Sequence, residues 1–232
     1  MTCARVILSG LFRVGLTGCI DMEISWYGHS CFRLAERGKA TIITDPFDDS
    51  IGYALPKLKA EVTTVSHEAP GHSNVENVKN VQRVINGPGE YEIGGVFIIG
   101  AAMHNLEADP PKRNVAYMFD FDGLNIAHLG DLDHVPAQST IEAMGAVDIA
   151  LVPVGAGGGL NATQAAEVVG LLEPSIVIPM HYKTDESTLD LETVDRFLKE
   201  MGVSRIQQEA LLKITKSGLP EQTQIVVLEC TQ

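Results

Sequence analysis

The sequence lacks several features that would point to particular functions. None of its four cysteines forms a Cys-x-x-Cys pair, so neither a thiolate metal site nor a redox dithiol is expected. This cysteine usage predicts a reducing compartment, the cytoplasm. No apolar run reaches the roughly 20 residues that a membrane-spanning helix needs, so no membrane partner is expected.

Basic residues are also scarce. Lysine and arginine number 17 against 30 aspartates and glutamates, and the formal net charge is -13. Nucleic-acid binding depends on basic side chains that neutralise phosphates, so the composition argues against a nucleic-acid partner and against a nuclease. It favours a small-molecule substrate and leaves a homo-oligomer open.

The chain length favours one domain. With 232 residues and 45% hydrophobic content, the chain can fill one core but is short for two domains and a linker. Residues 16–19 resemble a lipoprotein processing site, but Arg13 interrupts the apolar segment before it. We therefore expect a domain over residues 22–232, with residues 1–21 as an extension that is disordered or belongs to a mis-called start.

Short apolar runs divided by turn residues predict a fold rich in strands. In the second half, helices alternate with strands, and Asn161 with Gln164 resembles a helix capping box. This pattern predicts an α/β (α+β) fold in which two packed sheets have helices outside them, a four-layer αββα sandwich. Strands are expected at residues 23–27, 31–34, 41–44, 62–65, 81–85, 96–99, 115–121, 124–129, 149–154, 176–178, 211–214 and 224–228, with helices around residues 162–172 and 191–201.

Five potential metal ligands stand just beyond predicted strands. They are His67, His72, His104, Asp131 and His181. A single histidine in such a place is most often a solvated loop residue. Because loops held by a rigid sheet can converge on one rim, the recurrence at several strand ends favours a shared site.

At these positions the sequence resembles the metallo-β-lactamase superfamily, and within it the branch of ascorbate-phosphate lactonases and related zinc-dependent hydrolases. The resemblance covers nearly everything from Glu23 to the C-terminus. Its carriers are Trp26-Tyr27-Gly28-His29-Ser30, Thr44-Asp45-Pro46, Ser66-His67-Glu68-Ala69-Pro70-Gly71-His72, His104, Gly130-Asp131 and Pro179-Met180-His181-Tyr182.

The resemblance implies a two-metal site from which two ligands are missing. In the family's H-x-H-x-D-H loop, Ala69 stands at the second histidine position and Gly71 at the aspartate position. The remaining ligands divide into His67 and His104 for the first metal, and His72 and His181 for the second, with Asp131 shared between them. Three ligands with an open position suit one catalytic ion. Zinc is expected, and manganese or iron remains open.

The implied activity is hydrolysis of a small ester, lactone or phosphodiester by water activated at the metal, with Asp131 and His181 as catalytic residues. The resemblance also implies a substrate contact or a supporting role for His29, although a histidine that only buttresses its turn fits equally well. Lys183 is a candidate for binding an anionic group of the substrate, but a surface lysine is the commoner case.

Three alternatives remain open at this point. Asp133 and His134 follow Asp131 closely and could replace a lost ligand. Glu68 could stand in for the missing aspartate, although a surface carboxylate is commoner at such a place. Finally, Ala69 and Gly71 would also fit a non-catalytic member of the fold that binds a ligand or partner.

Overall fold

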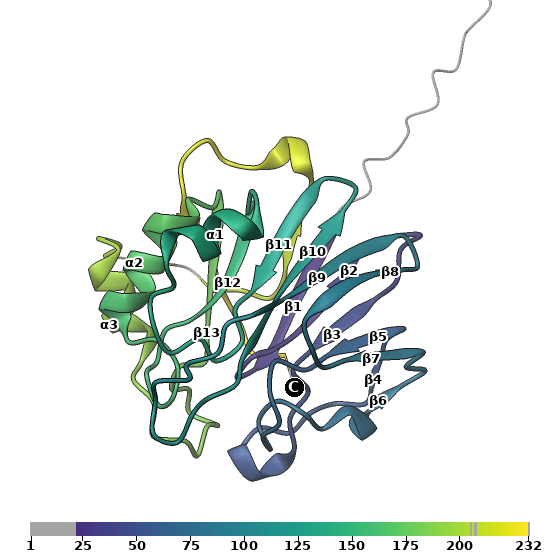
Figure 1. The fold of residues 1–232 in the computed structure, drawn as a ribbon, viewed down its shortest axis with the longest axis horizontal. Coiled ribbons are helices and arrows are strands. Elements are labelled where there is room, and N and C mark those ends of the chain that lie inside the picture. Colours follow the sequence, from purple (N-terminus) through teal and green to yellow (C-terminus); the bar gives the residue numbers. More distant parts are fainter. Residues whose placement is uncertain (1–21, 205, 207, 232) are drawn as a thin grey trace, which may run out of the picture.

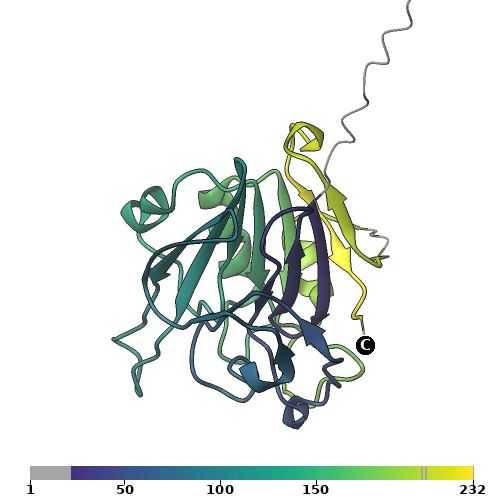
Figure 2. The ribbon, with the colours of Figure 1, turned by 90° about the vertical axis from the view of Figure 1, so that its right-hand side faces the viewer.

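The computed structural model describes residues 22–204, 206 and 208–231. The predicted extension over residues 1–21 lies outside them. Two main β-sheets are stacked face to face (Figures 1 and 2), and the helices lie on one side of the stack. The predicted mixed α/β sandwich is confirmed.

The first sheet contains the N-terminal strands. Its six strands run in the order β15-β1-β2-β3-β5-β7. They are β1 (Met22–Gly28), β2 (Cys31–Ala35), β3 (Ile42–Thr44), β5 (Val62–Thr64), β7 (Arg83–Ile85) and β15 (Leu212–Ile214). Strands β3, β5 and β7 are parallel, so the loops that follow them leave from the same edge of the sheet.

The second sheet has seven strands in the order β16-β13-β12-β11-β10-β9-β8. They are β8 (Gly89–Ile93), β9 (Val96–Ala102), β10 (Val115–Phe121), β11 (Leu124–His128), β12 (Ile149–Pro153), β13 (Ile176–Met180) and β16 (Gln224–Ile225). Asp122 and Gly123 join β10 to β11, both with positive φ, as a two-residue hairpin turn requires. Two short pairs complete the strands, β4 (Leu58–Lys59) with β6 (Val78–Lys79) and β14 (Gln208–Glu209) with β17 (Val227–Leu228).

Three α-helices are described, α1 (Gln138–Met144), α2 (Ala162–Leu172) and α3 (Val194–Glu200). Figure 1 shows them beside the seven-stranded sheet. Helix α2 begins with the predicted capping box of Asn161 and Gln164 and ends at Leu172, with Glu173 as its C-cap just before Pro174. None of the described helices combines the length and apolar character needed to span a bilayer.

The outer face of the six-stranded sheet is covered differently. Within the described residues its covering segments contain two 3-10 turns, η1 (Asp49–Ile51) and η2 (Val75–Asn77), and the short β4–β6 pair, instead of α-helices. Pro46, Gly52 and Pro56 interrupt the segment between β3 and β5, and such residues oppose a continuous helix. The fourth layer is therefore built of loops, which pack over a second buried cluster around Phe47 and Tyr53.

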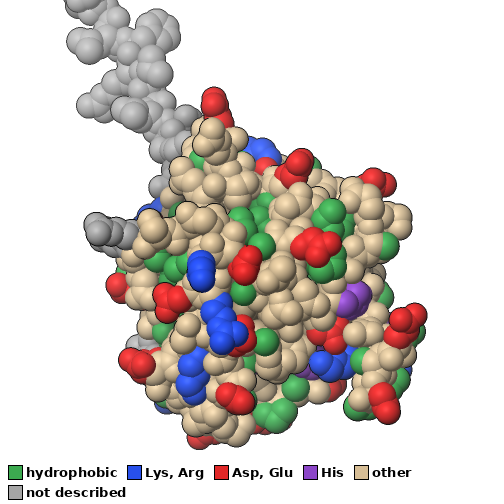
Figure 3. Space-filling view, turned by 90° about the vertical axis from the view of Figure 1, so that its left-hand side faces the viewer, with side chains coloured by type: hydrophobic (Ala, Val, Ile, Leu, Met, Phe, Trp, Pro, Cys, Tyr) green, Lys and Arg blue, Asp and Glu red, His purple; other side chains and the backbone are tan. Residues whose placement is uncertain are grey.

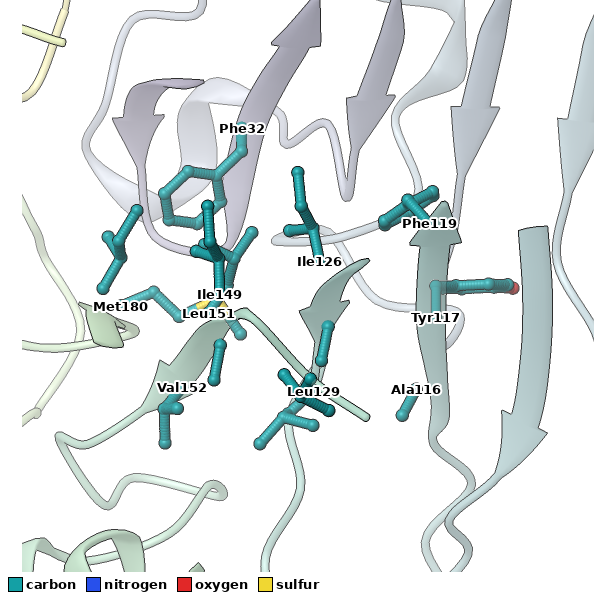
Figure 4. Close-up of a cluster of buried hydrophobic side chains, with 14 of the residues drawn as sticks. Phe32, Ala116, Tyr117, Phe119, Ile126, Leu129, Ile149, Leu151, Val152 and Met180 are labelled. Carbon is teal, nitrogen blue, oxygen red and sulfur yellow. The ribbon is translucent and has the colours of Figure 1, made fainter. Parts of the chain in front are cut away.

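The main core lies between the two sheets. Phe32 of the first sheet and Ile126, Leu151 and Phe119 of the second are fully buried there, and Figure 4 shows these side chains gathered in one cluster. This core holds the two sheets at fixed positions, so the loops at their shared edge are also held in place.

Candidate metal centre

Five polar side chains meet at one edge of the sandwich. His29 follows β1, Asp45 follows β3, His72 lies in the loop after β5, Asp131 follows β11, and His181 follows β13. The strands come from both sheets, so the site bridges the two halves of the fold.

Four of these residues bring potential ligand atoms within 4.8 Å of one another: His29, His72, Asp131 and His181. Oδ2 of Asp131 is 3.1 Å from Nε2 of His72 and 3.3 Å from Nε2 of His181. The three histidines are almost completely buried, whereas the Asp131 side chain keeps 17% of its surface exposed. Asp131 is therefore the member of the cluster that solvent reaches most easily.

Backbone geometry holds the cluster in an unusual conformation. The φ values of His29, Asp45 and His181 are 50°, 39° and 52°, which residues other than glycine rarely adopt. The amide of His181 donates to the carbonyl of His29 at 3.1 Å, so the two loops fix each other. Such strain persists where the surrounding structure enforces it, most often at functional sites.

Asp45 orients His72. Nδ1 of His72 lies 2.8 Å from Oδ2 of Asp45, whose carboxylate also accepts hydrogen bonds from the amide and hydroxyl of Ser66. A carboxylate behind an imidazole fixes the ring so that Nε2 faces a metal, as in many metal sites. Thr44-Asp45-Pro46 belongs to the motif that carries the resemblance, but the motif alone indicates no role for Asp45.

Asn114 positions the two other loops. Its backbone amide donates to Nδ1 of His104, and its side chain accepts from the amide of Asp131. No sequence motif indicates this role, because a single asparagine before a strand has many ordinary explanations.

The protonation states follow from burial and charge. Burial opposes a charge on His72, but the carboxylates of Asp131 and Asp45 outweigh it and raise the pKa of His72 to about 10. Burial would likewise raise the pKa of Asp131, yet the imidazoles of His181 and His72 hold it well below its ordinary value. Burial and the neighbouring imidazoles lower the pKa of His29 well below its usual range, so His29 is neutral near pH 7.

The donor set fits a divalent ion. Ligand atoms about 2.0–2.1 Å from a tetrahedral metal are about 3.3 Å apart, close to the 3.1 and 3.3 Å that separate Oδ2 of Asp131 from the two Nε2 atoms. Oδ1 of Asp131 is buried without a hydrogen-bond partner among the described residues. Imidazole and carboxylate donors suit zinc, iron or manganese. His72, Asp131 and His181, the ligands predicted for the second metal, are the residues that would hold the ion.

His67 and His104, predicted for the first metal, do not join this cluster of described residues. Nε2 of His67 lies 3.8 Å from Oδ2 of Asp131, so His67 stands beside it. His104 lines a neighbouring cavity of 430 Å³ together with His67, Glu68 and Arg113. Nδ1 of His104 already accepts the Asn114 amide, which leaves Nε2 to carry the proton of a neutral ring.

The remaining candidates have other partners. The Lys183 ammonium donates to the carbonyls of Ser187 and Leu189, so it closes the loop after His181, and its predicted substrate role stays a prediction. Asp133 pairs with His134 at 3.0 Å, and neither belongs to the ligand cluster.

Residues 23–181 match the family model described as the beta-lactamase superfamily domain. The chain belongs to the metallo-β-lactamase superfamily. The superfamily predicted from the sequence motifs is thereby confirmed, over more than half of the chain.

Similar proteins extend this result. A UPF0173 protein of Pyrococcus furiosus is 30% identical over 204 residues, which cover 80% of this chain and 93% of the relative. A UPF0173 metal-dependent hydrolase of Thermoplasma acidophilum is 28% identical, covering 71% of this chain and 84% of the relative. A crystal structure of a proposed zinc-dependent hydrolase of the superfamily from Thermotoga maritima shares 37% identity with a TM-score of 0.74, covering 89% and 98% of the two chains. Together they support a metal-dependent hydrolase.

Proposed function

We propose that this chain is a hydrolase that uses one divalent metal ion to cleave a small ester, lactone or phosphodiester. The observation that carries the proposal is the convergence of His72, Asp131 and His181. Oδ2 of Asp131 lies 3.1 Å from Nε2 of His72 and 3.3 Å from Nε2 of His181. Zinc is the ion we expect, because two imidazoles and one carboxylate with an open position are typical of catalytic zinc.

A bound divalent ion would supply the charge that acidifies a water molecule to a pKa of about 7 and polarises the scissile group. Among the protein's own groups, the ionised carboxylate of Asp131 contacts both His72 and His181. It is also the part of the cluster that solvent reaches. The preceding Gly130 has φ 59° and leaves no space for a side chain beside Asn114. The loop therefore presents Asp131 in one position.

His67 is suited to accept the proton of the attacking water. The hydroxyl of Ser66 donates to Asp45 and lies 3.1 Å from Nδ1 of His67. Because the only hydroxyl proton is used on Asp45, Nδ1 of His67 must donate to Ser66, which leaves the lone pair on Nε2. Burial lowers the pKa of His67, so its ring is neutral near pH 7 and can take up a proton and pass it to the leaving oxygen.

The cavity beside His67 is the proposed substrate site. Its 430 Å³ suit a small molecule. Arg113 lies on its wall without a hydrogen bond or ion pair to any other described residue, and Nε2 of His104 is free to donate there. Glu68 supplies one opposing carboxylate. An arginine and an imidazole N–H recognise an anionic oxygen, so a phosphodiester fits best of the three substrate classes. The acidic and basic side chains visible on the helix-bearing face are intermixed (Figure 3). Because the described residues of this face show no continuous basic patch of the kind that binds nucleic acid, we propose a small-molecule substrate.

The experiment is metal analysis coupled to hydrolysis. Protein purified with zinc should contain about one ion per chain and cleave bis(p-nitrophenyl) phosphate. His181→Ala should lose both metal and activity, whereas His134→Ala, at a histidine outside the cluster, should keep both. A wild-type protein that binds no zinc, iron or manganese on titration would overturn the proposal.

A rival function rests on the position of His72 between two carboxylates, 2.8 Å from Asp45 and 3.1 Å from Asp131. With a pKa of about 10, its imidazolium can neutralise Asp131 and Asp45 without any metal. A chain of this kind would be a non-catalytic member of the fold that binds a ligand or partner in the cavity. Wild-type protein that takes up no metal from excess zinc, and binds a phosphodiester without cleaving it, would favour this rival.

A further inference from the structure

Gly71 and His29 come into close contact at the metal centre. Gly71 stands where the family's loop carries an aspartate, and it is buried. A Cβ atom built on Gly71 would lie 2.9 Å from Nε2 and 3.0 Å from Cδ2 of His29. The imidazole of His29 thus fills the space into which a side chain at position 71 would point.

Lack of space, and not the backbone conformation, excludes a side chain at position 71. The backbone of Gly71 does not have the positive φ that would favour glycine, so an aspartate could adopt its conformation. Contacts closer than 3.0 Å to a Cβ essentially never occur in proteins. An aspartate at position 71 and the imidazole in its present place therefore exclude each other.

We propose that His29 is a metal ligand in this chain, replacing the aspartate that Gly71 lacks. The inference rests on the proposed function and names a further ligand of the same site. Nε2 of His29 is 3.0 Å from Nε2 of His72, again close to the separation of about 3.3 Å for two ligands of one tetrahedral metal. With His29, the position predicted for the second metal regains a fourth protein ligand, and the attacking water would then enter as a fifth ligand, an expansion that catalytic zinc sites allow.

The backbone around His29 is fixed well enough for this role. Its carbonyl accepts a hydrogen bond from the indole of Trp26 at 3.0 Å and another from the amide of His181 at 3.1 Å. Its ring packs against the ring of His181, with centroids 4.3 Å apart. A histidine that only buttressed the turn would not need its Nε2 directed at Nε2 of His72.

The replacement changes the charge of the site. The family's pattern would give two carboxylates and two imidazoles, whereas this chain offers Asp131 and three imidazoles. One negative charge is lost, and the set moves toward nitrogen donors, which suit zinc and iron better than manganese. The two departures from the motif thus have different consequences, because Ala69 removes a ligand and Gly71 exchanges one.

The test measures cobalt binding, which is read from the visible absorption of Co²⁺ and needs no enzymatic activity. The variants are His29→Ala, Gly71→Asp and the double variant, with His134→Ala as the control. Loss of a residue that only supports a ligand costs about 10- to 100-fold in metal affinity. His29→Ala should therefore weaken Co²⁺ binding by more than about 100-fold.

The double variant makes the decisive comparison. Gly71→Asp alone should weaken binding, because the new side chain collides with the ring of His29. In the His29→Ala background the same substitution should restore binding and shift preference toward Mn²⁺, since a carboxylate then occupies the freed space. Circular dichroism of each variant checks that it is folded.

Two results would overturn the inference in distinguishable ways. If wild type and His29→Ala bind Co²⁺ equally while His181→Ala does not, His29 is no ligand and the proposed function stands. If wild type itself binds none of Co²⁺, Zn²⁺, iron and manganese, the proposed function fails, and the inference fails with it.

Discussion

Nδ1 of His72 lies 2.8 Å from the carboxylate of Asp45, and both side chains are completely or almost completely buried. The contact fixes the ring so that Nε2 faces Asp131 and His29. Asp45 therefore acts on the metal centre through His72, without lying in the ligand cluster itself.

Asp45→Asn should weaken metal binding by about 10- to 100-fold, as loss of a partner behind a metal ligand usually does. The amide keeps the size of the carboxylate but loses its charge, so His72 is oriented less firmly. Zinc affinity measured by competition with a chromophoric chelator tests this, and Asp185→Asn at an exposed position is the control. An unchanged zinc affinity in a folded variant would mean that Asp45 only stabilises the loop around Ser66 and does not orient His72.

His67→Ala should lower kcat by about 100-fold or more and leave the metal content near that of the wild type. This outcome is expected because His67 lies outside the ligand cluster, with its lone pair available on Nε2. Metal analysis and steady-state kinetics on the same preparation separate the two roles. If the variant loses its metal instead, His67 is a ligand, as the resemblance to the family first implied.

Protein stripped of metal should lose stability as the pH rises. His72 has a pKa of about 10 in the folded protein against about 6.5 when unfolded, so protonation stabilises the folded state. Its contribution is complete below pH 6.5 and disappears as the pH rises through 10. Thermal unfolding in chelator between pH 6.5 and 10 should show a falling Tm. The decline should be smaller in His72→Gln, and an equal decline in both proteins would contradict the assignment.

The sequence predicted most of the framework because the signals were local. The Asp122-Gly123 turn, the Asn161 capping box and the apolar strands each depend on neighbouring residues, and the structure contains all of them. Helix α1 went unpredicted because it is short and its N-cap residue, Ala137, has no side chain that could accept a capping hydrogen bond. The second predicted helix begins later than expected, at Val194, because Leu191 packs against Gly157 instead.

The site was harder to predict than the framework, because its contacts are long-range. His72, Asp131 and His181 were found through their places after strands, and the structure brings them together. The pairing of His29 with Gly71 joins residues from separate loops, and only the packed structure shows that one side chain fills the space the other leaves. The loop motif shows that position 71 lacks the aspartate ligand. It contains nothing that indicates which residue replaces that ligand.

Gly130→Ala should destabilise the protein more than Gly123→Ala. Both glycines have positive φ, 59° and 90°, but a Cβ on Gly130 would meet Oδ1 of Asn114 at 2.3 Å, whereas one on Gly123 meets nothing within 4 Å. Gly123→Ala should cost about 1–2 kcal/mol from its backbone alone, and Gly130→Ala a further 1–3 kcal/mol, roughly, from overpacking. Urea unfolding of both variants measures the difference, and equal losses would show that the loop before Asp131 gives way freely.

Arg113→Ala should raise KM for a phosphodiester and leave kcat nearly unchanged. The guanidinium lies on the cavity wall beside His104, away from the ligand cluster, so it would bind the substrate equally in the ground state and the transition state. Loss of one charge-assisted hydrogen bond at this exposed position corresponds to about tenfold in KM. Arg37→Ala, at an exposed arginine in another loop, removes the same charge and should change neither constant. A fall in kcat at constant KM would instead place Arg113 among the groups that act on the transition state, and equal effects of the two variants would reduce its role to net charge.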